Sequence, residues 1–166
     1  MAIRRVVTGQ DKNGKSIIVS DEQVEPIHVS TTSLTRLWGA EEPPKFPQSG
    51  KAPAYEKMFP GPGGYRFLIM TLPPNSVSAP SAEEMKRIAP DVHAHMEKGD
   101  LGMHTTDTVD LEVVLSGEAT QEFDDGVKVH LKAGDTFIQN GTRHRWSNRG
   151  SVPAVIAVVI IGGHPR

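Results

Sequence analysis

The chain has 166 residues, the size of one domain, and 37% of them are hydrophobic, as in ordinary globular proteins. Its formal net charge is −2 and it has no long basic run, so nucleic acid and anionic membranes are not expected partners. The absence of cysteine excludes disulfides and thiolate metal sites. No apolar stretch follows the basic N-terminus or reaches the length of a membrane span, so we expect a cytoplasmic protein.

The first third of the chain predicts short strands joined by turns. Residues 4–8 and 16–20 flank Asn13-Gly14, a dipeptide typical of hairpin turns because both residues tolerate positive φ. A further short apolar segment spans residues 33–38. Residues 41–64 are rich in proline and glycine, and we expect them to form a surface loop or an arm.

This N-terminal region also carries apolar side chains that an arm cannot bury by itself. They predict that the arm packs on the barrel or on a second subunit, and therefore that the protein is a homodimer. The residues are Leu34, Leu37, Trp38, Phe46, Tyr55 and Phe59.

The middle of the chain predicts one strand and one short helix. Residues 65–72 are apolar and rich in strand-forming types, and Pro73 ends them. Ser81 is a suitable N-cap for a helix with acidic residues in its first turn. The helix is expected to end before Pro90 or to resume briefly after it. Residues 81–98 are a candidate lid.

From residue 103 onward the pattern is almost entirely strand and turn. Strands are expected near residues 110–115, 119–123, 127–132 and 136–139. The apolar pattern of residues 152–161 predicts a last strand that is buried on both faces. Closely spaced strands with turns between them favour a sandwich or barrel. We divide the single domain into N-terminal strands and arm (1–75), a helical or lid segment (76–102) and barrel motifs (103–166).

Two segments carry spacings that suggest chemistry. In residues 103–117, His104 and Thr106 are two apart, Asp110 follows, and Gly117 comes after six more residues. In residues 134–148, His144 stands three residues after Gly141 and four before Asn148.

These segments resemble the two cupin motifs. His104 takes the first histidine place of the first motif, Thr106 the second, and Asp110 the place of a glutamate. Gln139 stands where the second motif usually has proline. The resemblance implies an all-β fold: a cupin-type double-stranded β-helix, or jelly-roll barrel, with an N-terminal strand and loop extension and one short helix.

The resemblance also implies one divalent transition metal inside the barrel. His104, Asp110 and His144 are the expected ligands, and the amide oxygen of Gln139 or water can replace the ligand lost at Thr106. Nitrogen and oxygen donors suit Fe, Mn, Ni or Zn, and the sequence does not choose among them.

Each residue also has a plainer interpretation. Asp110 can orient a histidine instead of binding metal, and Gln139 can be a hydrogen-bonded core amide. Thr106 is either a pocket hydroxyl or an ordinary strand residue, and Trp146 is either a pocket wall or part of the core.

Two further polar residues are candidates for roles in the pocket. If the strand is regular, Glu112 faces the same interior as Asp110, where burial would raise its pKa and suit it to acid–base catalysis alongside Asp110. Arg143 is a candidate contact for an anionic substrate.

The function expected from this resemblance is that of a metal-dependent enzyme. Its substrate would be a small organic acid or an oxygenated carbonyl or aromatic compound. The reaction would be decarboxylation, lyase chemistry or isomerisation, or dioxygen chemistry with iron. The alternatives are a non-catalytic cupin that binds a small molecule and a metal-free, epimerase-like cupin.

Overall fold

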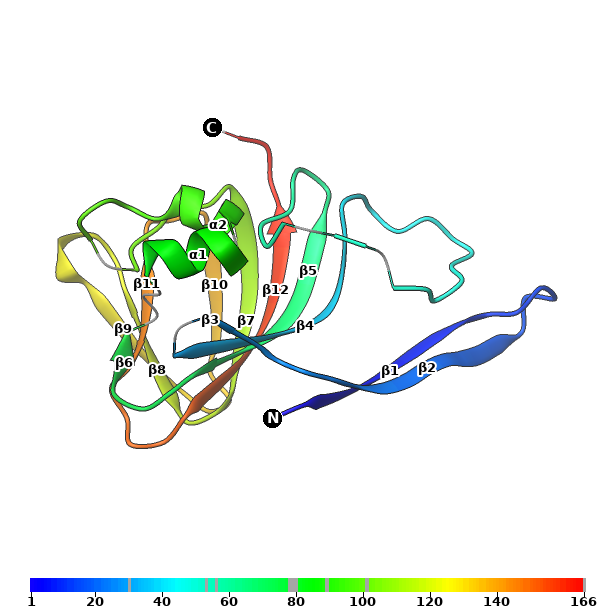
Figure 1. Cartoon of the computed structure of the whole chain (residues 1–166), viewed down its shortest axis with the longest axis horizontal. Helices are drawn as coiled ribbons and strands as arrows, with labels where there is room; N and C mark the ends of the chain where they lie inside the picture. The colour runs from blue at the N-terminus through cyan, green and yellow to red at the C-terminus, as the bar shows by residue number, and fades with distance from the viewer. Residues whose placement is uncertain are drawn as a thin grey trace.

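The computed structural model describes residues 1–29, 31–52, 54–55, 57–77, 81–88, 90–100 and 102–165. Two facing sheets form the body, with a separate hairpin beside them (Figure 1). The strands are β1 Ile3–Gln10, β2 Ser16–Val24, β3 Ile27–Val29, β4 Thr32–Ala40, β5 Tyr65–Leu72, β6 Ser76–Val77, β7 Thr108–Ser116, β8 Glu118–Glu122, β9 Lys128–Lys132, β10 Thr136–Asn140, β11 Arg145–Asn148 and β12 Ala154–Gly162. The helices are α1 Ala82–Ile88, α2 Pro90–His95 and a 3-10 turn at Asp124–Gly126.

The hydrophobic core lies between the two sheets. One sheet has the strand order β10-β7-β12-β5-β4-β3 and the other the order β6-β11-β8-β9. The inward residues of β12 alternate with outward ones, and Ala154 and Ile156 are completely buried. Leu72 on the neighbouring strand is also completely buried. Period-2 alternation in β12 therefore packs one face of this strand into the core, as expected for a barrel, whereas its sequence predicts burial on both faces.

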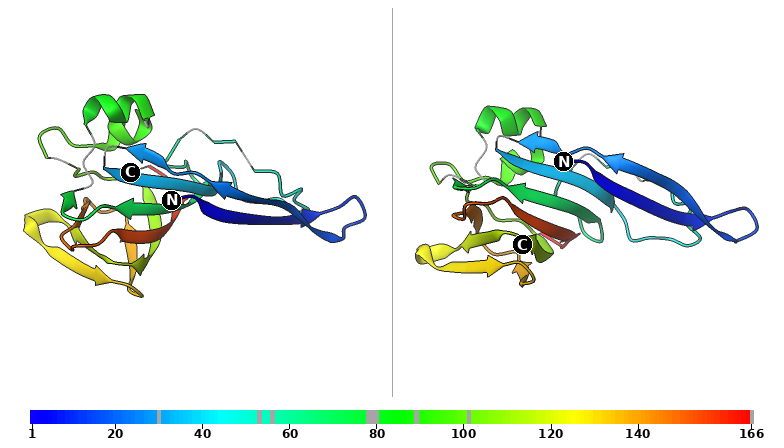
Figure 2. Two further views of the ribbon diagram at one scale, coloured as in Figure 1. Left: turned by 60° about the horizontal axis from the view of Figure 1, so that its bottom comes forward. Right: turned by 90° about the horizontal axis from the view of Figure 1, so that it is seen from below.

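The N-terminal hairpin is β1–β2, and it extends away from the body (Figures 1 and 2). Its turn contains Gly14 at φ 77°, and the Asp11 side chain accepts hydrogen bonds from the amides of Asn13 and Lys15. Gly9 in β1 lies so close to the loop after β4 that an added Cβ would stand 2.6 Å from the carbonyl oxygen of Ser49. The loop thus packs on the hairpin through a position that needs glycine.

The helical segment contains two short helices, and the second is the brief resumption after residue 89 that the sequence allows. The Ser81 hydroxyl accepts a hydrogen bond from the Glu84 amide at 3.2 Å, as its N-cap role predicts. The helix ends at Ile88, and a second begins at Pro90, because proline fits the first turn, where no hydrogen-bond donor is needed. Both helices lie over one end of the barrel (Figure 1).

The boundary drawn at residue 75 does not separate the barrel from the N-terminal region. β5 pairs along its whole length with β12, and β4 pairs with β5, so both are central strands of the larger sheet. The arm also hides most of its apolar residues within the chain. Leu37 is buried, Leu34 and Phe59 line an interior cavity, and Tyr55 stacks under Arg66 at 4.2 Å, whereas Phe46 stays 82% exposed.

Among the residues that the structure describes, no helix is both long and apolar enough to cross a membrane.

Candidate functional site

A cavity of about 120 Å³ lies inside the barrel and is lined in part by Met85 of α1 and Val92 of α2. Eleven of its fifteen lining residues are apolar, and the other four are two histidines and two carboxyl residues. The polar residues are His104, Asp110, Glu112 and His144. The apolar residues are Leu34, Met58, Phe59, Leu68, Met70, Met85, Val92, Met96, Trp146, Val158 and Ile160. An apolar pocket with a few convergent polar groups is the usual form of a small-molecule site.

His104 and His144 face each other across a backbone bridge. Each amide donates a hydrogen bond to the other residue's carbonyl oxygen, at 3.0 Å and 2.9 Å. Directly opposed residues of an antiparallel pair place their side chains on the same face. The two rings accordingly meet with their centroids 4.3 Å apart. The folded chain thus brings together histidines separated by forty positions in the sequence.

Backbone carbonyls select the tautomer of both rings. Nδ1 of His104 lies 3.0 Å from the Gly102 oxygen, and Nδ1 of His144 lies 2.9 Å from the Thr142 oxygen. A carbonyl only accepts, so each Nδ1 carries the proton and each Nε2 keeps a free lone pair. Burial lowers the pKa of His104, and burial together with His104 lowers the pKa of His144 to about 4. Both imidazoles are therefore neutral near pH 7.

Asp110 and Glu112 project from β7 into the same cavity, each with a carboxyl oxygen that has no hydrogen-bond partner. Burial raises the pKa of Asp110 to about 6, against a smaller lowering effect from Thr108. Burial and the neighbouring Asp110 raise the pKa of Glu112 to about 9. In the protein without metal, Glu112 is therefore a neutral acid at pH 7.

Gln139 holds the turn that carries His144. Its Nε2 donates hydrogen bonds to the carbonyl oxygen of Thr142 at 2.7 Å and to its hydroxyl at 2.6 Å. The same Thr142 carbonyl accepts from Nδ1 of His144. Oε1 of Gln139 is buried without a partner, opposite Asp110 on the neighbouring strand.

The sequence of this region matches a known family. Residues 92–161 match the model of the cupin domain. These residues form a cupin domain. The predicted all-β, double-stranded β-helix fold is therefore confirmed.

Two groups of fungal proteins are similar over part of this cupin. Phomopsin biosynthesis cluster proteins C' and D of Diaporthe leptostromiformis are 45% identical over 51 residues, 31% of this chain and 27% of each relative. Oryzines biosynthesis cluster protein J of Aspergillus oryzae is 47% identical over 45 residues, 27% of this chain and 25% of the relative. The matched part thus spans only about a quarter of these relatives.

The cupin domain of Schizosaccharomyces pombe Cnp3 has a similar structure. The TM-score is 0.53 at 9% sequence identity, covering 96% of this chain and 87% of that one. At this identity the likeness concerns the fold alone.

Two of the residues predicted to contact the substrate lie in different places relative to the cavity. Trp146 lines the cavity and packs edge-on against Phe137 at 6.3 Å. Thr106 is buried outside the cavity lining, where its hydroxyl lies 2.8 Å from that of Thr108.

Arg143 also lies outside the cavity lining, in a surface ion network. It pairs with Glu97 at 2.7 Å, Asp100 at 2.7 Å and Asp124 at 3.1 Å, and Arg145 pairs with Asp100 and Glu122. The hydrogen bonds to Glu97 and Asp100 raise the pKa of Arg143, and the bond from Arg143 lowers the pKa of Glu97. These ion pairs connect Glu97 and Asp100 to the two arginines that flank His144 at the start of β11.

Sequence reasoning missed the methionines that form much of the cavity wall. Met58, Met70, Met85 and Met96 come from the arm, β5, α1 and the segment after α2. No single periodicity links them, because they belong to different elements. Unbranched methionine side chains fill irregular spaces and adapt to varied ligands.

The four expected metal ligands are brought together only in part. His104, His144 and Asp110 line one cavity, whereas Gln139 lies outside the lining. The described residues contain no group of three or more His, Cys, Asp or Glu side chains close enough to hold an ion. Two nitrogen donors are thus in place, and the metal stays a prediction.

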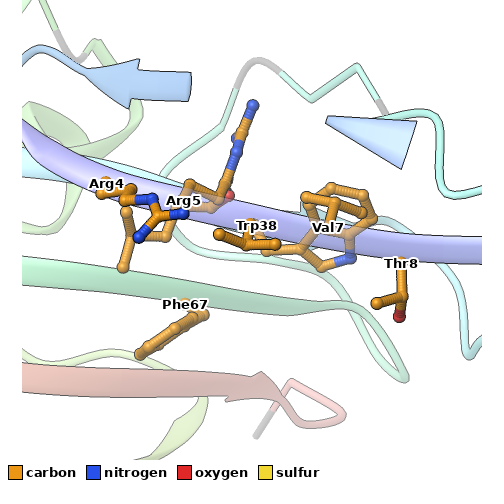
Figure 3. Close-up of a pocket in the computed structure, with 8 residues that line it drawn as sticks. Arg4, Arg5, Val7, Thr8, Trp38 and Phe67 are labelled. Atoms are coloured by element: carbon orange, nitrogen blue, oxygen red, sulfur yellow. Dashed lines mark hydrogen bonds between the residues drawn. The ribbon is translucent and has the colours of Figure 1, made fainter. Parts of the chain in front are cut away.

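A second, wider groove of about 450 Å³ lies between β1 and the outer side of β4 and β5. Figure 3 shows Arg4, Arg5, Val7 and Thr8 of β1 beside Trp38 and Phe67. Its two arginines already pair with Asp21 and Glu22 of β2. None of the described residues that line the groove is a histidine or a carboxyl residue, so the smaller inner cavity is the better candidate for chemistry.

Proposed function

We propose that this cupin is a metal-dependent enzyme that acts on a small oxygenated organic molecule by decarboxylase, lyase or isomerase chemistry. The observation that carries the proposal is the His104–His144 pair, with both Nε2 atoms free, in an apolar cavity shared with two carboxyl groups. The partial relatives named for biosynthesis clusters support a role in metabolite chemistry.

His104 and His144 would supply two nitrogen ligands to one Fe, Mn, Ni or Zn ion. Asp110 is the proposed carboxylate ligand, and Oε1 of Gln139 or water would complete the set. Neutral imidazoles and buried oxygens without partners fit such an ion chemically, although only the nitrogen pair is assembled. A bound divalent ion would polarise a substrate oxygen as a Lewis acid.

The protein's own side chains define what the cavity can accept. Its apolar walls exclude water and bind a carbon skeleton, and a cavity of about 150 Å³ is known to hold benzene. Among the described residues, no lysine or arginine lines this cavity, and Arg143 is paired with carboxylates elsewhere. In the absence of a metal ion, this charge balance favours a neutral carbonyl compound over an organic acid, whereas a bound divalent cation would also accommodate an acid. Oε2 of Glu112, which has no partner, can hold a proton beside such a ligand.

Elemental analysis of protein purified without chelators tests the metal. We expect about one transition-metal ion per chain in the wild type, and loss of most of it in His104→Ala and in His144→Ala. His28→Ala is the matched control, because His28 is exposed on β3 and lies outside the cavity lining. A wild-type protein that retains none of the four ions after incubation and dialysis would overturn the metal proposal.

A metal-free acid–base enzyme is the second candidate. Two observations favour this candidate. The described residues bring no third metal ligand together with the two histidines, and Glu112 is protonated beside Asp110. Isobutyramide and isobutyrate are isosteric probes that separate the candidates by ligand-observed NMR. If isobutyramide binds more tightly than isobutyrate in the presence of EDTA, the metal-free site is supported. This binding should be lost in Leu68→Trp, because the larger side chain would fill the cavity. Binding of either probe only with added metal supports the first candidate. Binding without turnover of any carbonyl compound would indicate a binding module.

A further inference from the structure

A third pocket, of about 310 Å³, lies where β1, β4 and the arm meet. Two arginines and two aromatic residues, Arg5, Arg36, Trp38 and Tyr55, form its polar and aromatic walls, and the rest of the lining is apolar or glycine. None of the described residues that line it is a carboxyl residue. We call this space the arginine pocket.

A bulge in β4 shapes one wall of the arginine pocket. Arg36 pairs with Leu68 and Trp38 pairs with Phe67, so the register shifts by one residue at Leu37. Such a shift turns the side chains on its two sides to different faces of the strand. The hairpin attaches at this bulge, where Nη1 of Arg5 donates a hydrogen bond to the Leu37 carbonyl oxygen at 2.7 Å.

The aromatic walls are held in place by close packing. Tyr55 lies against Gly39, where an added Cβ would stand 2.8 Å from Cε1 of the ring. The guanidinium of Arg66 lies 4.2 Å from the centroid of the Tyr55 ring, and that of Arg36 lies 6.0 Å from it. The ring is therefore positioned before any ligand arrives, which lowers the entropy cost of binding.

The second aromatic wall has a similar partner. The guanidinium of Arg5 lies 5.8 Å from the ring of Trp38, and Figure 3 shows the two side chains beside each other. Burial raises the pKa of Tyr55, and the charges of Arg36, Arg66 and Arg5 act in the opposite direction. Three guanidinium groups thus act on one small region of the fold.

One of these three positive charges is not compensated. Arg5 forms an ion pair with Glu22, and Arg66 forms one with Glu41 at 2.5 Å. Arg36 has no ion pair with any residue in the described part of the chain, and its Nε is buried without a hydrogen-bond partner. Nε of Arg5 is buried without a partner as well. Buried donors of this kind favour a ligand that brings an acceptor.

We propose that the arginine pocket binds the carboxylate of a small aromatic acid. The single uncompensated charge on Arg36 matches one negative charge, and a planar guanidinium matches a planar carboxylate. Tyr55 and Trp38 offer faces to a flat ring. A cavity of about 150 Å³ holds benzene, so about 310 Å³ has room for a ring with its carboxylate.

This site is separate from the metal site proposed above. Among the described residues, none lines both the arginine pocket and the cavity of His104 and His144. The charge requirements also differ, because the inner cavity has carboxyl groups and no arginine in its described lining. An anion can therefore bind in the arginine pocket whether or not the inner cavity holds a metal.

NMR titration of the full chain with benzoate, in EDTA, tests the proposal. Benzamide is the neutral probe of the same shape. We expect benzoate to bind about ten-fold more tightly than benzamide, because only the carboxylate pairs with Arg36. Benzoate should shift the Nε–H signals of Arg5 and Arg36 and the ring signals of Tyr55, and should leave the His104 and His144 rings unchanged.

Two variants separate this site from general attraction of anions. Arg36→Gln should weaken benzoate binding about ten-fold and abolish the preference over benzamide. Arg4→Gln is the matched control, because Arg4 removes the same charge from the same strand but lies outside the lining of the arginine pocket. It should bind benzoate as the wild type does, and circular dichroism checks the folding of both.

The wild-type titration decides the question even if Arg36→Gln folds poorly. Equal affinity for benzoate and benzamide, or benzoate shifts confined to the histidine rings, would overturn the proposal. An equal loss of binding in Arg4→Gln and Arg36→Gln would overturn it too, because the attraction would then be non-specific. Tighter binding of phenyl phosphate than of benzoate would overturn the assignment to carboxylates.

Discussion

Glu112 and Asp110 stand two residues apart on β7 and face one apolar cavity, where burial penalises their charged forms. The alternation of β7 made the shared face of these two residues predictable. Their unpaired oxygens were not predictable, because these depend on distant segments such as β12 and α1 that exclude water. For the same reason the sequence did not show that Gln139 and His144 share the Thr142 carbonyl.

Glu112→Gln should change how the stability of chelator-treated protein depends on pH. The folded pKa of Glu112 is about 9, above its ordinary value of 4.5, so the folded state binds an extra proton between these values. The free energy of unfolding should therefore fall as pH rises through this window, by at most ~1.4 kcal/mol per unit. The free energy of unfolding of Glu112→Gln should fall less over the same window, because glutamine has no proton to lose.

Urea unfolding followed by tryptophan fluorescence at pH 7, 8 and 9 measures this difference. Asp110, with a folded pKa of about 6, and His144, with one of about 4, add little slope in this range. Parallel curves for wild type and Glu112→Gln would mean that Glu112 is ionised in the folded protein.

At the scale of elements, α2 is anchored to the arm by one carboxylate. Oδ2 of Asp91 accepts hydrogen bonds from the amides of Met58 at 2.6 Å and Phe59 at 3.1 Å. Met58, Phe59 and Val92 all line the cavity, so this contact joins two parts of its cover. The cap at Ser81 made the helical segment predictable, but a contact across more than thirty residues leaves no local signal.

Asp91→Ala should loosen this cover. Two amides lose their acceptor, which should cost about 1–3 kcal/mol of stability. Hydrogen exchange at Met58 and Phe59 should become at least several-fold faster. Glu83→Ala, at an exposed position of α1, should change stability by less than about 0.5 kcal/mol. Unchanged exchange at Met58 and Phe59 in Asp91→Ala would show that other contacts hold the cover.

At the scale of the whole molecule, the two motifs predict the barrel. The sequence did not predict how much of the barrel and of its cavity the N-terminal region forms. β4 and β5 carry no motif, yet they complete the sheet and supply Leu34, Leu68 and Met70 to the cavity. Strand pairing between residues 65–72 and 154–162 is non-local, so apolar alternation reveals the strands but not their partners.

The central claim is that His104 and His144 present free Nε2 atoms to one ligand site. Long-range ¹H–¹⁵N NMR of the seven imidazoles tests it most directly. In metal-free protein at pH 7, both rings should be neutral with the proton on Nδ1, and one equivalent of Zn²⁺ should shift their two Nε2 resonances and leave the exposed His28 unchanged. Protons on Nε2, or zinc shifts confined to other histidines, would contradict the claim.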